Sequence, residues 1–201
     1  LIAGDTWELA DLVEYMLVTS SNDAAYQIAA SVPVYGAQGQ DAFIDAMNRT
    51  AAKLGLHTIR FENASGLDMP GPTPSSFGSA HDVAKLVSYA LEKEPDIFIA
   101  SSYDGYEYLS LGNHTHTANN TNILVRQLPA LVLSKTGYTD ATGGNLAFVY
   151  EHGPQHPVVV VLLGSTFTGR FDDAATIIRG LTEARSESTQ ETNIMFLENQ
   201  D

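Results

Sequence analysis

The chain has 201 residues, 44% of them apolar, and this length and composition suit one compact domain with a substantial core. The 24 Asp and Glu residues outnumber the 10 Lys and Arg, and the net charge of −14 disfavours nucleic acid and anionic membrane surfaces as partners. The absence of cysteine excludes disulfides and thiol catalysis, and no apolar run predicts a membrane span or an export signal. Any membrane association would therefore come from segments outside this chain.

The first elements are expected to be two helices separated by a polar break. Apolar residues at helical spacing predict a helix over residues 6–18, with Asp5 as its N-cap. Four small polar residues at 19–22 interrupt this pattern, which resumes over residues 24–29.

The middle of the chain predicts two further helices around a long loop. A third amphipathic helix is expected over residues 43–54, closed by Gly55 in a left-handed conformation. Residues 61–78 are rich in Asn, Ser, Gly and Pro and predict an ordered loop of a length that is often functional. Ser79 is then placed to cap a fourth helix over residues 83–91.

The last third of the chain predicts a small sheet and a closing helix. Three β segments are expected at residues 130–138, 145–151 and 157–165, and their short connections predict antiparallel neighbours. A helix should follow over residues 171–184. The polar, acidic remainder, residues 185–201, predicts a tail or linker.

Two short constellations carry side chains suited to chemistry. Ser20 and Asn22 place a hydroxyl and a carboxamide two residues apart in the polar break, where helix capping would also explain them. Lys135, Thr136 and Gly137 end an apolar strand segment. A cation beside a hydroxyl suits an anionic substrate group, and glycine permits a close approach by another backbone. Alone, this tripeptide would equally fit an ordinary strand end.

The order of the two constellations makes them more informative. Ser-x-Asn followed after a long interval by Lys-Thr-Gly resembles the second and third motifs of penicillin-recognising serine enzymes. Other stretches resemble the serine D-alanyl-D-alanine carboxypeptidase family in particular, over roughly residues 1–183: residues 11–13, 16–18, 47–48, 54–56, 61–68, 80–84, 122–124, 143–144 and 163–164, and Arg170.

This resemblance implies an α/β (α+β) fold of the β-lactamase and transpeptidase type. An antiparallel sheet would be flanked by helices, and a helical subregion would hold Ser20 and Asn22 across a cleft from Lys135. The implied activity is penicillin-sensitive removal of the terminal D-alanine from peptidoglycan stem peptides through an acyl-enzyme, without a cofactor or a metal. The implied partners are stem peptides ending in D-Ala-D-Ala and β-lactam antibiotics, at an extracytoplasmic location.

The resemblance also implies a role for each matching residue. Ser20 would relay a proton to the leaving amine, Asn22 would hold the substrate amide, and the Tyr138 N–H would supply half of an oxyanion hole. The implied catalytic residues are Ser20, Asn22 and Lys135, and the implied substrate-binding residues are Thr136, Gly137, Tyr138 and Thr139.

One departure from the family pattern limits the expected activity. The family's nucleophile motif, Ser-x-x-Lys, occurs nowhere in this sequence, and neither do its N-terminal strands. Residues 1–184 are therefore expected to form a partial catalytic domain that is inactive alone and leaves a sheet edge exposed. The chain could be part of a longer enzyme, could be completed by another polypeptide, or could be a noncatalytic peptidoglycan-binding module.

Two weaker candidates complete the set of sites. His114 and His116 could share one strand face and bind a metal, but no third ligand stands at a recognised spacing, which favours exposed loop histidines. Glu62 resembles the deacylating glutamate of class A β-lactamases, although its neighbours fit the carboxypeptidase pattern better. A β-lactamase-like hydrolase is therefore kept as an alternative.

Overall fold

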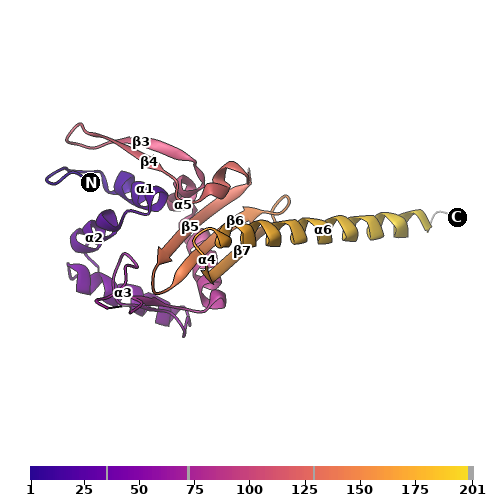
Figure 1. Ribbon diagram of the computed structural model, residues 1–201, viewed down its shortest axis with the longest axis horizontal. Coiled ribbons are helices and arrows are strands. Elements are labelled where there is room, and N and C mark those ends of the chain that lie inside the picture. The colour runs from indigo at the N-terminus through magenta and orange to yellow at the C-terminus, as the bar shows by residue number, and fades with distance from the viewer. Residues whose placement is uncertain (35, 72, 129, 199–201) are drawn as a thin grey trace.

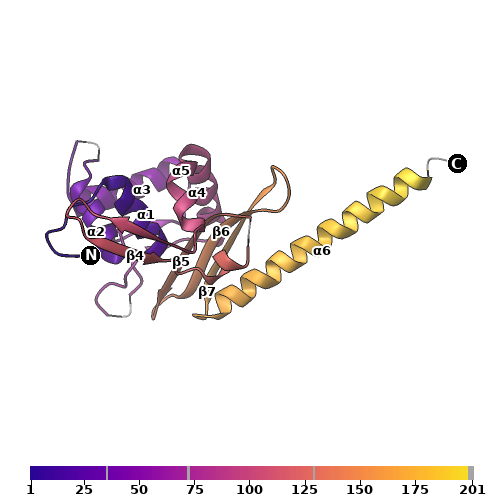
Figure 2. The same ribbon diagram turned by 90° about the horizontal axis from the view of Figure 1, so that it is seen from above.

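The computed structural model describes residues 1–34, 36–71, 73–128 and 130–198, with side chains described up to residue 185. Helices α1 to α3 lie together at one side of a three-stranded sheet, and α6 runs from the sheet away from the rest of the chain (Figures 1 and 2). The helices of the first half are α1 (Leu9–Thr19), α2 (Asn22–Ser31) and α3 (Gln40–Lys53). The expected α/β arrangement of an antiparallel sheet with flanking helices is confirmed.

The first helix begins later than the sequence predicted. Helix α1 starts at Leu9, and its N-cap, Glu8, makes no side-chain capping bond. Asp5 does not cap the helix, because its carboxylate accepts hydrogen bonds from the Thr6 N–H at 2.9 Å and from His116 at 2.9 Å. The prediction of Asp5 as N-cap was wrong because this carboxylate is engaged by a distant strand.

The local signals of the middle segment are confirmed. Gly55 adopts a φ of +68° directly after α3, as a left-handed helix end requires. The Ser79 hydroxyl accepts a hydrogen bond from the Asp82 N–H at 3.2 Å and caps helix α4 (Ala80–Lys93). The intervening loop is closed at its base by two short paired strands that the sequence had not indicated, β1 (Arg60–Phe61) and β2 (Ser76–Phe77).

The sheet follows the predicted segments closely. Its strands are β5 (Leu131–Thr139), β6 (Gly143–Glu151) and β7 (Pro157–Ser165), paired antiparallel in the order β5-β6-β7. No described strand pairs with the outer edge of β7, which agrees with the expected exposed edge.

Helices α4 and α6 both contact strands β6 and β7 of the sheet. Leu146, Phe148 and Tyr150 form one core with Phe171 and Ala174 of α6. Helix α4 contacts strands β6 and β7. The sheet is therefore fixed between α4 and the first turns of α6.

A hairpin connects the helical part to the sheet. Strands β3 (Gly105–Leu109) and β4 (Thr115–Asn119) pair antiparallel, and Tyr108 and Ala118 pack against Val18 of α1. The short elements around the hairpin are α5 (Pro95–Phe98), η1 (Ile99–Ser102) and η2 (Ile123–Arg126). Ser101 of η1 holds β5: its hydroxyl accepts from the Ser134 N–H at 3.0 Å, and its carbonyl accepts from the Ser134 hydroxyl at 2.9 Å.

The last helix is longer than predicted. Helix α6 (Gly169–Glu198) passes the expected end at residue 184, and residues 185–198 contain neither Gly nor Pro to stop it. Residues 199–201 lie outside the described part, and a domain boundary near residue 184 stays a prediction. Among the described helices, none is both long and apolar enough to cross a membrane.

Two glycine-to-alanine substitutions test the close packing at the start of β6 and the open space beside Gly180 of α6. A Cβ at Gly144 would overlap the Thr166 backbone carbonyl oxygen, so Gly144→Ala should lower the free energy of unfolding by about 1–3 kcal/mol. Gly180 lies in α6 with open space around it, so Gly180→Ala should raise the free energy of unfolding by about 1 kcal/mol. Urea denaturation measures both, and equal effects would contradict the close approach at Gly144.

Candidate active site

The polar residues in the break between α1 and α2 differ in what they contact. Ser20 ends α1 in the left-handed conformation with a φ of 56°, and the Ser21 hydroxyl caps α2 by accepting from the Ala24 N–H at 3.2 Å. Ser21 therefore takes the capping role that would have explained Ser20 and Asn22. Both of these residues line one cleft.

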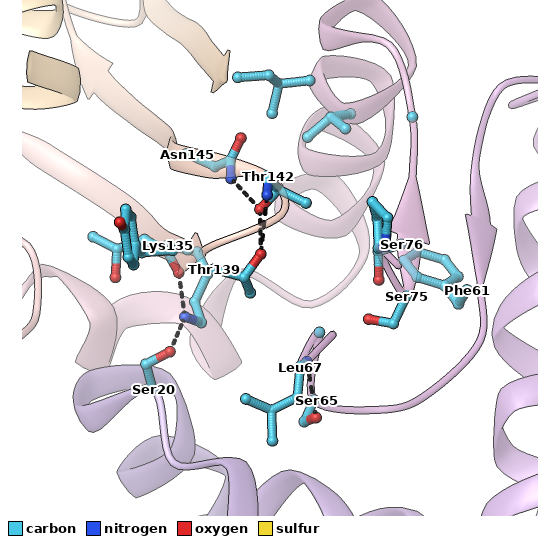
Figure 3. A pocket seen from close by; sticks show the side chains of 18 of the residues that line it. Ser20, Phe61, Ser65, Leu67, Ser75, Ser76, Lys135, Thr139, Thr142 and Asn145 are labelled. Atoms are coloured by element: carbon cyan, nitrogen blue, oxygen red, sulfur yellow. Dashed lines mark hydrogen bonds between the residues drawn. The ribbon is translucent and has the colours of Figure 1, made fainter. Parts of the chain in front are cut away.

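A contact between Ser20 and Lys135 joins the helical part to the sheet. The Lys135 ammonium donates to the Ser20 hydroxyl at 2.5 Å and to the Thr136 carbonyl at 2.7 Å (Figure 3). The two side chains are 115 positions apart in the chain. The structure thus brings the two sequence constellations together.

Lys135 has an altered proton affinity. Burial, and to a lesser extent the positive charge of nearby Arg170, together lower the pKa of the Lys135 ammonium from 10.5 to about 8. The side chain therefore remains mainly protonated at neutral pH, yet it gives up its proton more readily than an exposed lysine. Such a group suits both anion binding and proton transfer.

The remaining residues of the Lys-Thr-Gly segment are fixed by their neighbours. The Thr136 hydroxyl lies 2.6 Å from the Thr121 hydroxyl, and the Gly137 carbonyl accepts a hydrogen bond from the Arg170 guanidinium. A Cβ on Gly137 would meet nothing closer than Asn145 at 3.7 Å. Packing within the chain therefore does not require glycine at this position. Gly137 lines the cleft, so the free space beside it belongs to the cleft.

The end of β5 continues into a small polar network. The Thr139 and Thr142 hydroxyls lie 2.8 Å apart, and the Asn145 amide donates to Thr142 at 3.3 Å (Figure 3). The Tyr138 side chain is 48% exposed and lies at the same end of the strand. All three threonine and tyrosine side chains of this turn line the cleft.

The cleft has a volume of about 790 Å³ and a second wall that the sequence had indicated only as a functional loop. Figure 3 shows Ser75 and Ser76 on the side opposite the Lys135 and Ser20 pair. The Ser75 hydroxyl is buried without a hydrogen-bond partner among the described residues. Among the described residues that line the cleft, Lys135 is the single charged one, and the others are uncharged polar or apolar residues.

The loop that forms this wall is held from within and from the sheet. The Asn63 carboxamide oxygen accepts from the Gly66 N–H at 2.7 Å, and its amide donates to the Leu67 carbonyl at 2.8 Å. Asp68 accepts from the Ala141 N–H at 3.2 Å, which ties the loop to the turn between β5 and β6. The Asn-rich composition could have indicated this internal bonding, but not the contact with the distant turn.

The weaker sequence candidates lie elsewhere. His116 is buried on β4 and contacts the Asp5 carboxylate, and His114 lies 3.4 Å from the same carboxylate, so the expectation of exposed loop histidines was wrong for His116. Burial raises the pKa of Asp5, but hydrogen bonds from His116, Ser110 and others outweigh burial and lower it overall. Within the described residues, no group of three such side chains is arranged to hold a metal ion. Glu62 pairs with Arg60 outside the cleft lining.

A helix-flanked antiparallel sheet with Lys-Thr-Gly on a cleft-facing strand, opposite a Ser-x-Asn break, defines a domain of the transpeptidase-like fold. The chain belongs to the D-alanyl-D-alanine carboxypeptidase family, a family of serine peptidases, whose profile matches residues 1–166. The resemblance inferred from the sequence motifs is therefore confirmed.

Individual relatives support the same assignment. The chain is 33% identical to the D-alanyl-D-alanine carboxypeptidase DacD of Escherichia coli (strain K12), over 88% of this chain and 42% of DacD. It is 32% identical to a D-alanyl-D-alanine endopeptidase of Haemophilus influenzae, over 76% of this chain and 49% of the relative. The chain thus spans less than half the length of these two relatives.

Solved structures agree on the fold. A mutant Streptomyces DD-transpeptidase matches with a TM-score of 0.76 at 26% identity, over 92% of this chain and 71% of that one. A cefotaxime-bound penicillin-binding protein of Listeria monocytogenes matches with a TM-score of 0.71 at 27% identity, over 88% of this chain and 66% of that one.

The altered pKa of Lys135 predicts a pH-dependent stability. The unfolded chain binds more protons than the folded chain between the folded value of about 8 and the ordinary 10.5, so stability rises with pH in this window. Lys135→Met should be more stable than the wild type at pH 7, and this difference should shrink by about 1 kcal/mol between pH 7 and 9.

Urea denaturation at pH 7, 8 and 9 measures this difference. Lys93→Met is the matched control, because a hydrogen bond from Lys93 to Glu92 raises the pKa of the Lys93 ammonium away from this range. If the difference in the free energy of unfolding between the wild type and Lys135→Met does not change with pH, the result would contradict a lowered pKa for Lys135.

Proposed function

We propose that this chain supplies the substrate-binding and proton-relay part of a peptidoglycan-processing serine DD-peptidase. The intact enzyme would remove the terminal D-alanine from stem peptides through an acyl-enzyme, on the extracytoplasmic side of the membrane where this substrate is found. The observation that carries the proposal is the contact between Lys135 and Ser20 in a cleft with no other charged lining residue. Family membership supports the reaction class.

The terminal carboxylate of the substrate is assigned to Lys135 and Thr136. An ammonium group has three N–H donors, and Lys135 directs two of them to the Ser20 hydroxyl and the Thr136 carbonyl. The third remains for a carboxylate, and a charge-assisted hydrogen bond is stronger than a neutral one. Thr139 adds a hydroxyl at the same end of the strand.

Proton transfer is assigned to Ser20. Its hydroxyl lies 2.5 Å from a lysine whose pKa is about 8, so a proton can pass from the ammonium through the hydroxyl to the departing amine. The Asn22 carboxamide, which lines the same cleft, would hold the substrate amide. The substrate would lie along β5 as an added strand, with the Tyr138 N–H as one oxyanion donor.

The covalent step needs a serine nucleophile within a Ser-x-x-Lys motif, and this sequence does not contain that motif. Acyl transfer in this class uses a serine nucleophile activated by a lysine, as Ser-x-x-Lys, and no such tetrad occurs here. We therefore assign binding but no turnover to this chain alone. Loss of a single oxyanion donor alone typically lowers the rate by about 10²–10³.

The other interpretations predict different behaviour. A noncatalytic peptidoglycan-binding module would use the same cleft for binding alone, in every form of the protein. A β-lactamase-like hydrolase would require a deacylating base, and Glu62 is engaged by Arg60 outside the cleft lining, which disfavours it. β-Lactam antibiotics are proposed as ligands, supported by the cefotaxime-bound and ampicillin-bound Listeria proteins of similar fold.

Equilibrium binding tests the assignment of Lys135. An acetylated peptide ending in D-Ala-D-Ala should bind at least about tenfold more tightly than its C-terminal amide, because the amide lacks the charge that Lys135 recognises. In Lys135→Met this ratio should fall to about one. Isothermal titration calorimetry measures the four affinities, and the same peptide ending in L-Ala-L-Ala is the stereochemical control. Equal affinities for acid and amide in the wild type would contradict the proposal.

Covalent labelling tests the assignment of the nucleophile. Incubation with a fluorescent penicillin followed by denaturing electrophoresis should give no adduct on this chain, since it contains no Ser-x-x-Lys. Escherichia coli DacD serves as the positive control, and a longer form of this protein that carries the tetrad should be labelled. An adduct on the present chain would contradict the assignment, and a longer form without label would favour the binding module.

A further inference from the structure

Two exposed aromatic side chains form one surface at the edge of the cleft. Tyr138 at the end of β5 is 48% exposed, and Phe167 between β7 and α6 is 57% exposed. Their ring centroids lie 5.1 Å apart with the planes at 88°. Tyr138 lines the cleft, so Phe167 extends the wall of the cleft outward. Adjacent large apolar side chains left open beside a cleft are typical of a contact surface.

Arg170 holds this aromatic pair in place. The Arg170 guanidinium carbon lies 4.9 Å from the Phe167 ring centroid, and Arg170 is buried, with 3% of its surface exposed. The same guanidinium donates to the Gly137 carbonyl of β5, next to Tyr138. The surface is therefore fixed to the strand that we assign to substrate binding, and a ligand would not have to order it.

The spacing along β5 indicates which part of a ligand reaches the pair. Tyr138 follows Lys135 by three residues, which corresponds to about 10 Å in an extended strand. A peptide whose terminal carboxylate meets Lys135 and which runs antiparallel along β5 covers about this length with its last three residues. The group that precedes the D-Ala-D-Ala unit would then lie at Tyr138 and Phe167.

The charges around the pair decide the chemistry of that group. Lys135 is the single charged residue among the described residues of the cleft lining, and the Arg170 guanidinium stacks on Phe167. A positively charged ligand group would meet the Lys135 ammonium in the cleft. The Asp173 carboxylate, near the same end of the sheet, already accepts a hydrogen bond from the Ser165 hydroxyl at 2.7 Å. The negative charge of the ligand is already assigned to Lys135. An uncharged apolar or aromatic group fits the exposed rings best.

We propose that Tyr138 and Phe167 determine specificity by binding an uncharged apolar or aromatic acyl group attached to the D-Ala-D-Ala unit of the ligand. This inference rests on the proposed function, because it places the carboxylate at Lys135. It extends that function by naming the class of acyl group that the site prefers.

Three ligands with the same D-Ala-D-Ala end and different acyl groups test the inference by calorimetric titration. The acyl groups are phenylacetyl, acetyl and lysyl with its free amines. The wild-type chain should bind the phenylacetyl ligand about tenfold more tightly than the acetyl ligand, and the lysyl ligand no more tightly than the acetyl one.

Variants of Phe167 separate this contact from the rest of the site. Phe167→Ala should reduce the preference for phenylacetyl over acetyl to about twofold or less. Phe167→Tyr should retain the preference. Tyr106→Ala is the matched control, because Tyr106 is 57% exposed on β3 and does not line the cleft. Thermal unfolding of each variant checks that it is folded.

The outcomes distinguish failure of this inference from failure of the proposed function. Equal wild-type affinities for phenylacetyl and acetyl ligands would overturn the aromatic subsite and leave the carboxylate assignment intact. Tightest binding of the lysyl ligand would overturn the uncharged character of the subsite. Absence of binding by all three ligands would overturn the proposed function, and the inference with it.

Discussion

The contact between the Lys135 ammonium and the Ser20 hydroxyl depends on every layer of the fold. It requires the break between α1 and α2, because Ser20 faces the cleft only in its left-handed position at the end of α1. It also requires β5 to be fixed beside the helices, which the hydrogen bonds between Ser101 and Ser134 achieve one residue before Lys135. A shift of β5 by one residue would turn Lys135 to the opposite face of the sheet. The register of one strand therefore determines whether the site exists.

Burial of a cation is unfavourable, and the structure offsets this cost only in part. Two hydrogen bonds stabilise the Lys135 ammonium, but its pKa of about 8 shows that desolvation and the charge of Arg170 prevail over them. A shift of this size corresponds to roughly 3 kcal/mol against the charged form. An anion bound at Lys135 would offset this cost. A carboxylate at Lys135 would restore the missing counter-charge, so ligand binding and stability are coupled at this residue.

The parts of the fold that the sequence predicted correctly are those with local causes. Gly55 ends α3 and Ser79 caps α4, because each signal acts within one helical turn. Asp5 was misassigned because its partner, His116, lies 111 positions away, and no local pattern reveals that contact. The same reason applies to the cleft. The motif residues were predicted, whereas the wall containing Ser75 depends on how the loop folds back, which composition alone does not specify.

The overall charge of the chain limits how the site can recognise an anion. A net charge of −14 repels a carboxylate-bearing peptide at long range, so attraction from the whole protein cannot guide such a ligand into the cleft. Salt screens charges beyond about 8–10 Å, but a short contact in a partly buried cleft is screened much less. In the proposed function, recognition would then come from Lys135 at close range and from the uncharged surfaces around it. Affinity in such a site is governed by how long the ligand stays rather than by how fast it arrives. The proposed contacts with the aromatic pair of Tyr138 and Phe167 would meet this requirement, because contacts with uncharged groups add to the residence time without depending on the field of the protein.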